Sequence, residues 1–289
     1  MIAYDNRNWL LILSRVRGTV LPRIAGRIAL VVAIAVAATY VYEEHGRDYA
    51  IPVTVHTIVG VALGLLLVFR TDSSYSRYWE GRILLGGMVN ACRDLARQGS
   101  AYLATDDARD GFCRYVPALY GSIRRHLRGE REMPELADSL TAEQRASLET
   151  SPAAPLVVAG WISDLLHREV AEGRLSEVRL RVIDANVTRM IDYWGGCERI
   201  VNTPIPFAYA HHIKGFLTLF CVTVPLALLD SMQWYTPVAA AVVAFALFGI
   251  DEIGVEIEDP FGYDPNDLPL DAIGSTIEAS VAASIRTAA

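Results

Sequence analysis

The chain has 289 residues, of which 52% are hydrophobic, and it carries a formal net charge of −7. Its apolar content exceeds the roughly 45–50% usual for soluble domains, and the long uncharged runs lie in the first and last quarters of the chain, which favours a membrane protein over a soluble enzyme. The acidic balance argues against a nucleic-acid binder, because phosphate contacts require clustered Lys and Arg.

The N-terminal segment, residues 1–23, is predicted to be a cytosolic or interfacial helix. Its apolar run is short and is followed by Arg15 and Arg17 with no small-residue cleavage site, so it is not a signal peptide. The residues that suit an amphipathic helix at the membrane surface are Trp9, Leu10, Ile12, Leu13 and Val16.

Two spanning helices are predicted within residues 24–69. The first, residues 28–42, is uncharged and extends back past Arg27, whose side chain can snorkel, to reach the roughly 20 residues that a bilayer requires. The second, residues 51–69, has His56 as its only ionisable residue.

Two further spanning helices are predicted within residues 205–250. Residues 205–229 and 234–250 are apolar and are separated only by the sequence DSMQ. A connection this short requires an antiparallel helical hairpin. The sequence therefore predicts four transmembrane helices.

The orientation of these helices follows from the basic residues in the short flanking segments. The loop EEHGRD holds one Arg and DSMQ holds none, whereas the segment before the first helix is rich in arginine. The arginines of that segment are Arg7, Arg15, Arg17, Arg23 and Arg27. We therefore expect both termini to be cytoplasmic, in a multi-pass protein of the inner membrane.

Residues 70–204 are predicted to form a cytosolic helical domain, because apolar residues recur there at helical spacing and no sustained alternating pattern of strands is present. The predicted helical segments are residues 83–103, 112–127, 156–170 and 178–200. Thr141 and Gln144 have the spacing of a capping box at a further helix start. Residues 251–289 read as a cytosolic acidic loop followed by a short helical tail from Ile273.

The second apolar helix has an unusual end. Val61, Leu65 and Phe69 are spaced by four residues and lie on one stripe, while Gly60 and Gly64 allow close approach of another helix on a neighbouring stripe. The stripe could simply contact lipid or core. Yet helix-compatible polar residues follow Phe69 with no Gly or Pro stop, so we expect the helix to leave the membrane and continue into the cytosolic domain.

Residues 69–86, FRTDSSYSRYWEGRILLG, resemble the signature of the bestrophin family in its bacterial members. The resemblance covers nearly the whole chain. It includes RGTVLP (residues 17–22), CERIVNTPIPFAY (residues 197–209) and EDPFGYDPNDLPLD (residues 258–271) in the family's order.

Bestrophins are pentameric ion channels in which the second transmembrane helix of each subunit lines one axial pore. The resemblance implies an all-α membrane protein with four transmembrane helices and a cytosolic helical domain, assembled as a homopentamer. It assigns Val61, Leu65 and Phe69 to a narrow hydrophobic neck that can gate by dewetting. It also places Val178 at a second, cytosolic aperture, and the alternative is an ordinary core residue at a helix start.

The loop around residues 258–271 resembles the acidic loop with which animal bestrophins bind calcium. Asp264 and Asp267 fall on its carboxylate positions, and carboxylate oxygens are the ligands that calcium prefers. Tyr263 and Pro265 interrupt the acidic run, however, so a solvated packing loop is the alternative. We expect no other cofactor.

The neck residues carry no charge and therefore do not select the sign of the permeant ion. The outer loop offers Glu43, Glu44 and Asp48 against one Arg, and a ring of carboxylates concentrates cations at an entrance. We therefore expect passive flow of small monovalent cations. The alternative is a chloride or other anion channel of the same architecture.

Three further classes of protein compete with a channel. The first is an intramembrane enzyme or haem protein, but the sequence has no Ser/His/Asp, Cys/His or paired acidic motif that would support it. The four cysteines also lack the spacing of a zinc site; they are Cys92, Cys113, Cys197 and Cys221. A secondary transporter would show an internal repeat, and none is found. A non-conducting membrane scaffold would be impermeable to ions. The sequence favours a channel over an enzyme.

Overall fold

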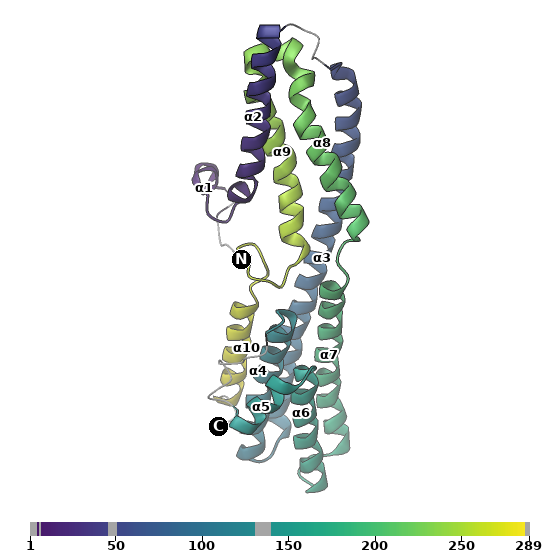
Figure 1. Ribbon diagram of the computed structural model, residues 1–289. Helices are drawn as coiled ribbons and strands as arrows, with labels where there is room; N and C mark the ends of the chain where they lie inside the picture. The colour runs from purple at the N-terminus through teal and green to yellow at the C-terminus, as the bar shows by residue number, and fades with distance from the viewer. Residues whose placement is uncertain (1–4, 6, 46–50, 131–139, 287–289) are drawn as a thin grey trace. The chain divides into compact units, whose positions relative to one another are not determined.

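The computed structural model describes residue 5 and residues 7–45, 51–130 and 140–286, and every regular element in these ranges is helical (Figure 1). The elements are α1 (Trp9–Ser14), α2 (Leu21–His45), α3 (Val53–Tyr102), α4 (Asp106–Leu127), α5 (Ala142–Thr150), α6 (Ala154–Ala171), α7 (Glu177–Asn202), α8 (Phe207–Met232), the 3₁₀ turn η3 (Gln233–Tyr235), α9 (Thr236–Glu258) and α10 (Leu270–Arg286). The all-helical prediction is confirmed for the described part of the chain.

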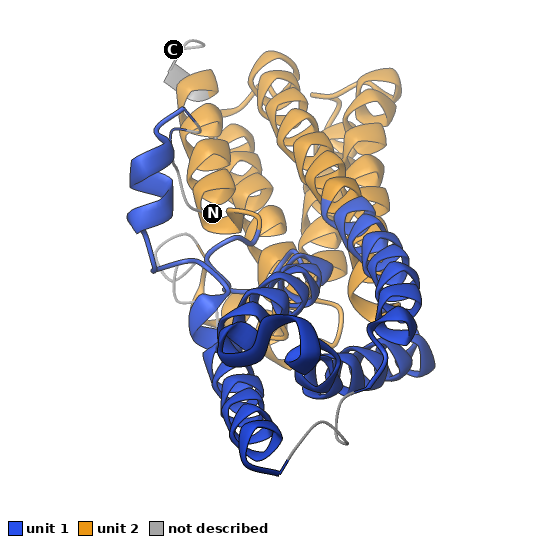
Figure 2. Ribbon diagram, turned by 90° about the horizontal axis from the view of Figure 1, so that it is seen from above, with its two compact units in different colours: residues 1–78, 204–267 blue, residues 79–203, 268–289 orange. Residues whose placement is uncertain are grey.

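The chain folds into two compact units (Figure 2). Residues 1–78 and 204–267 make up unit 1, and residues 79–203 and 268–289 make up unit 2. Both units are therefore discontinuous in sequence, and α3 contributes its first half to one and its second half to the other.

Unit 1 contains the apolar helices. Its core is formed by one side of α2, α3, α8 and α9, because each of these helices buries apolar residues at helical spacing. On α2 the core positions are Ile24, Val31 and Ala35, seven and four residues apart. Among the described residues, three helical stretches are long and apolar enough to cross a membrane: Leu21–His45, Val53–Tyr102 and Phe207–Glu258, the last of which includes both α8 and α9.

The helices of unit 1 are longer than the apolar segments predicted for them. The α2 helix begins at Leu21 instead of residue 28, and α9 continues to Glu258 although the apolar run ends at Ile250. The connection between α8 and α9 is short, as predicted, but it lies later in the chain than DSMQ, because α8 continues to Met232. It consists of the 3₁₀ turn Gln233–Tyr235, in which Gln233 has a positive φ of 47°.

Unit 2 packs α4, α6, α7, α10 and the second half of α3 around an apolar core. The predicted segments 112–127, 156–170 and 178–200 lie within α4, α6 and α7, and the segment 83–103 matches the second half of α3 except for its last residue. The capping box is also confirmed: the Thr141 hydroxyl accepts from the Gln144 backbone N–H, and the Gln144 side chain accepts from the Thr141 backbone N–H. The tail helix α10 begins at Leu270, three residues before the predicted start.

The N-terminal helix α1 has six residues and none of them is buried. Val16 was predicted to belong to this helix, but the helix ends at Ser14. The Asn8 side chain caps the helix by accepting from the Leu11 backbone N–H.

Helix α3 runs for 50 residues without a break, from Val53 to Tyr102. The prediction that the helix continues past Phe69 is therefore confirmed. It follows that the apolar stripe and the polar sequence after it are carried by one continuous helix.

A candidate ion pathway along α3

The predicted neck residues lie on an exposed face of α3. Val61 is 72% exposed in the single subunit, and Leu65 and Phe69 are each 55% exposed. A contiguous exposed apolar patch marks an interaction face or a lipid face. The three side chains form one stripe, as their four-residue spacing requires.

The opposite face of α3 is buried. Leu63 and Leu67 belong to the core of unit 1, and Arg70 and Ser74 continue the same face at spacings of three and four residues. Each side of the helix therefore has a distinct role in unit 1. One face fixes the helix in the unit, and the other is left free for a partner, for lipid or for a pore.

Arg70 is the central polar residue of the buried face. Its side chain is 2% exposed, and its guanidinium donates to Asp251 Oδ1 of α9 over 2.9 Å and to Glu258 Oε2 over 3.3 Å. A buried charge must be paired to be tolerated. Arg70 immediately follows Phe69, so this ion pair fixes the rotation of α3 at the end of the apolar stripe.

Two more carboxylates of α9 are paired with arginines of α2. Arg27 donates to Glu252 over 3.1 Å, and Arg23 lies 3.5 Å from Glu256. Glu252 and Glu256 are both buried, so these contacts stabilise charges that would otherwise be costly. The last part of α9 thus ties α2 and α3 together through ion pairs.

The remaining predicted pore residues are placed as follows. Val178 lies near the start of α7 and is 73% exposed, so it is not a core residue of the single subunit. Glu43 and Glu44 are exposed at the end of α2, which is not the helix that carries the neck stripe. Asp48 lies outside the described residues.

Asp264 and Asp267 come together in the loop after α9. The Asp264 backbone N–H donates to Asp267 Oδ2 over 2.7 Å, and the Asp264 carboxylate accepts from Arg23 over 2.5 Å. Burial raises the pKa of Asp267 to about 6, and the charges of Asp264, Asp259 and Glu256 act in the same direction. The described residues contain no group of three or more His, Cys, Asp or Glu that could hold a metal ion.

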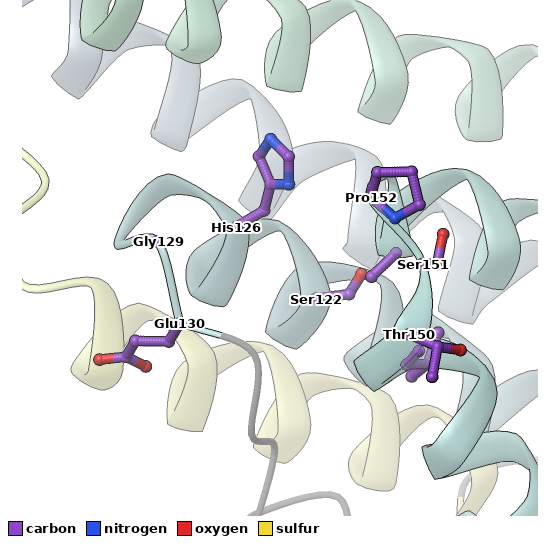
Figure 3. A pocket seen from close by; sticks show the side chains of 9 residues that line it. Ser122, His126, Gly129, Glu130, Thr150, Ser151 and Pro152 are labelled. Carbon is purple, nitrogen blue, oxygen red and sulfur yellow. The ribbon is translucent and has the colours of Figure 1, made fainter.

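A pocket of about 360 Å³ with a mixed polar and apolar lining lies in unit 2 between α4 and the connection from α5 to α6 (Figure 3). His126 and Ser122 line it from α4, and Thr150 and Ser151 line it from the other side. The His126 imidazole is bonded to Glu198 over 2.7 Å and packs edge-on against Trp194. His126 therefore has a structural partner within unit 2.

A family profile described as "Bacterial/Fungal Bestrophin protein" matches residues 1–283 of this chain. The chain belongs to the bestrophin family. Among solved structures, a bacterial bestrophin homolog from Klebsiella pneumoniae superposes on this bestrophin with a TM-score of 0.86 at 29% identity, and the match covers 91% of this chain and 98% of that one. The family resemblance read from the sequence is thus confirmed.

Relatives of this bestrophin carry channel names. A voltage-dependent anion channel-forming protein of Nostoc sp. is 37% identical over 280 residues, covering 95% of this chain and 91% of the relative. A protein of the same name from Escherichia coli K12, YneE, is 32% identical over 285 residues, covering 96% and 92%. Together with the apolar helices, these matches point to a membrane protein that is a non-enzymatic ion channel.

Sequence reasoning missed the buried ion pairs of this bestrophin. The sequence analysis assigns residue 70 to the start of the cytosolic domain and residue 251 to the start of the loop after the last apolar helix. Two signals were present. Arg70 follows Leu63 and Leu67 at core spacing, and helix-compatible residues continue past Ile250 as they do past Phe69.

Proposed function

We propose that this chain is the subunit of a homopentameric bestrophin channel that conducts anions passively through one axial pore lined by α3. The observation that carries the proposal is the exposed stripe of Val61, Leu65 and Phe69, directly opposite the face that α3 buries in unit 1. Five copies would place three apolar rings around an axis, and such a constriction can stop ion flow by dewetting.

The membrane topology belongs to the same proposal. Helix α2, the first part of α3, α8 and α9 serve as four transmembrane helices in the lipid of an inner membrane, with both termini cytoplasmic. The basic residues before α2 support this orientation. Unit 2 would then be the cytosolic domain, with exposed Val178 available for a second aperture.

The proposal that the permeant ion is an anion is based on the names of the related proteins. The relatives are named as anion channel-forming proteins, which favours the anion alternative over the cation preference that the outer carboxylates suggest. A cation channel remains the second candidate, because Glu43 and Glu44 are exposed at the end of α2. A divalent ion at Asp264 and Asp267 stays a prediction from the sequence.

The test is a current measurement in planar bilayers under a potassium chloride gradient. We expect the purified wild-type protein to give a reversal potential near the chloride equilibrium potential. A reversal potential near that of potassium would favour the cation channel. The complete absence of current would favour a non-conducting scaffold and contradict the proposal.

The neck is tested in the same bilayers with the double variant Leu65→Ala and Phe69→Ala. Removing two apolar rings should widen and hydrate the constriction, so we expect a larger conductance. The matched control is Val238→Ala with Val242→Ala, which shortens two similarly exposed side chains of α9 and should leave the current unchanged. Equal currents from the neck and control variants would remove the stripe from the ion pathway.

A further inference from the structure

The exposed stripe of α3 does not end at Phe69. Asp72 lies three residues after Phe69 and seven after Leu65, and Ser76 follows four residues later. Residues at these spacings share one face of a helix, and both side chains are exposed. Asp72 is therefore the first ionisable residue that the stripe presents after the apolar segment.

The charge of Asp72 is not compensated within the subunit. Among the described residues, none donates a hydrogen bond to its carboxylate and none forms an ion pair with it. The nearest arginine in sequence, Arg70, is buried on the opposite face and is paired with Asp251 over 2.9 Å. The carboxylate is thus free to act on ions that pass along the stripe.

We propose that five Asp72 carboxylates form a ring at the inner end of the neck and set the ratio of cation to anion permeability. This inference rests on the proposed function, because it requires α3 to line the pore. The neck residues are apolar and select no sign, so the nearest fixed charge on the same face decides which ions accumulate beside the constriction. A ring of carboxylates repels anions and attracts cations, so in the proposed anion channel it lowers the preference for anions without abolishing it.

The Asp72 ring and the outer carboxylates differ in their position relative to the neck, and therefore in their expected effect on ion selectivity. Glu43 and Glu44 lie on α2, whereas Asp72 lies on the helix that carries the neck stripe. A fixed charge in a narrow passage with apolar walls acts more strongly than one beside an open entrance, because low-dielectric walls focus its field. Asp72 therefore determines selectivity more than the outer carboxylates do.

The sequence of α3 allows a matched set of variants, because Asp72 is followed by Ser73 and then by Ser76. Asp72→Asn removes the charge. Asp72→Ser with Ser76→Asp keeps the charge on the stripe, one turn farther from the neck. Asp72→Ser with Ser73→Asp keeps the composition but turns the charge by about 100° around the helix, away from the stripe.

The measurement is the chloride-to-sodium permeability ratio, taken from reversal potentials in planar bilayers. We expect Asp72→Asn to raise this ratio about threefold or more in 0.1 M salt, because focused fields change local ion concentrations by factors of this order or larger. The variant with Asp at position 73 should behave like Asp72→Asn. The variant with Asp at position 76 should keep the wild-type ratio. In 1 M salt, where the Debye length falls to about 3 Å, the differences should shrink.

The outcomes separate this inference from the proposed function. An unchanged ratio for Asp72→Asn, with current still present, would overturn the ring and leave the channel intact. Equal ratios for the two charge-moving variants would overturn the assignment to the stripe. A wild-type protein that carries no current would overturn the proposed function, and the ring with it.

Discussion

The two halves of α3 are held by different means. In unit 1, the helix is fixed by the buried ion pair between Arg70 and Asp251. In unit 2, the same helix packs through glycines, and the position of a Cβ on Gly87 would be only 2.5 Å from the Tyr193 ring. An ion pair fixes the rotation of a helix, because both partners must face each other, whereas a glycine contact fixes how closely two helices approach.

This difference fits what each half of α3 has to do. The first half must present one stripe, with Val61, Leu65 and Phe69, and a small rotation would move these side chains away from it. The second half only needs close packing with α4 and α7. Variants that break one kind of contact and leave the other intact therefore test whether the two halves have separate roles.

The largest effect is expected from Arg70→Met. Removing the arginine deprives two carboxylates of their partner, and it leaves buried Asp251 with only the more distant Lys214 ammonium at 3.9 Å. Breaking a buried ion pair in this way costs about 3–5 kcal/mol of stability. We expect the free energy of unfolding of Arg70→Met, measured by denaturant titration in detergent micelles, to be lower than that of the wild type by this amount. The stripe should also lose its orientation, so that current falls even in the folded fraction.

Two controls accompany the Arg70 variant. Arg97→Met breaks an exposed ion pair with Asp94 on the other half of α3 and should cost about 1 kcal/mol or less. The double variant Arg70→Met with Asp251→Leu removes the most buried pair of charges and should regain part of the stability, because an apolar pair can replace a buried ion pair. The recovery should be incomplete, because Glu258 and Lys214 each lose a partner. A loss of stability in Arg70→Met no larger than that in Arg97→Met would contradict the role of the Arg70 ion pairs in fixing α3.

A smaller effect is expected from Gly87→Ala. The new methyl group would overlap the ring of Tyr193, and overpacking of this kind costs about 1–3 kcal/mol. The neighbouring Gly86→Ala is the matched control, since its nearest contact is the tip of Arg82 at 3.5 Å. That change should be neutral or stabilise the helix by up to about 1 kcal/mol. Thermal unfolding of both variants measures the difference, and equal melting temperatures would show that the contact with Tyr193 is loose.

Part of this fold could be predicted from the sequence because local signals were strong. Long uncharged runs marked the apolar helices, and the spacing of Thr141 and Gln144 marked a helix start. The lack of Gly or Pro after Phe69 predicted the continuity of α3. Each of these signals depends on residues close together in the chain.

The buried charges could not be predicted in the same way. Arg70 and Asp251 are 181 positions apart, and an isolated charge at the end of an apolar run usually faces solvent. The free-energy cost of burying such a charge is offset only by a partner on another helix, and a single sequence does not show that pairing. The exposed stripe was easier to find because it depends on one helix alone, whereas its role in a pore depends on neighbouring subunits.

The smallest effect concerns Asp271 of α10, in unit 2. Its carboxylate accepts from Arg128 over 3.1 Å and from Arg124 over 2.9 Å. The hydrogen bond from Arg128 holds the pKa of Asp271 below its usual value, and the positive charges of Arg128, Arg124 and Arg125 act in the same direction. Since the carboxylate itself is largely exposed, solvent screening limits its contribution to about 1 kcal/mol or less.

The sign of the pH dependence follows from this lowered pKa. The stabilisation is fully present above the pKa of the unfolded chain, about 3.9, and is lost as the pH falls through the lower folded value. We therefore expect Asp271→Asn to be less stable than the wild type from pH 5 to 7, and the gap to close below about pH 4. Unfolding curves of both proteins across pH 3–7 measure it. A gap of constant size down to pH 3 would mean that Asp271 acts through packing and not through its charge.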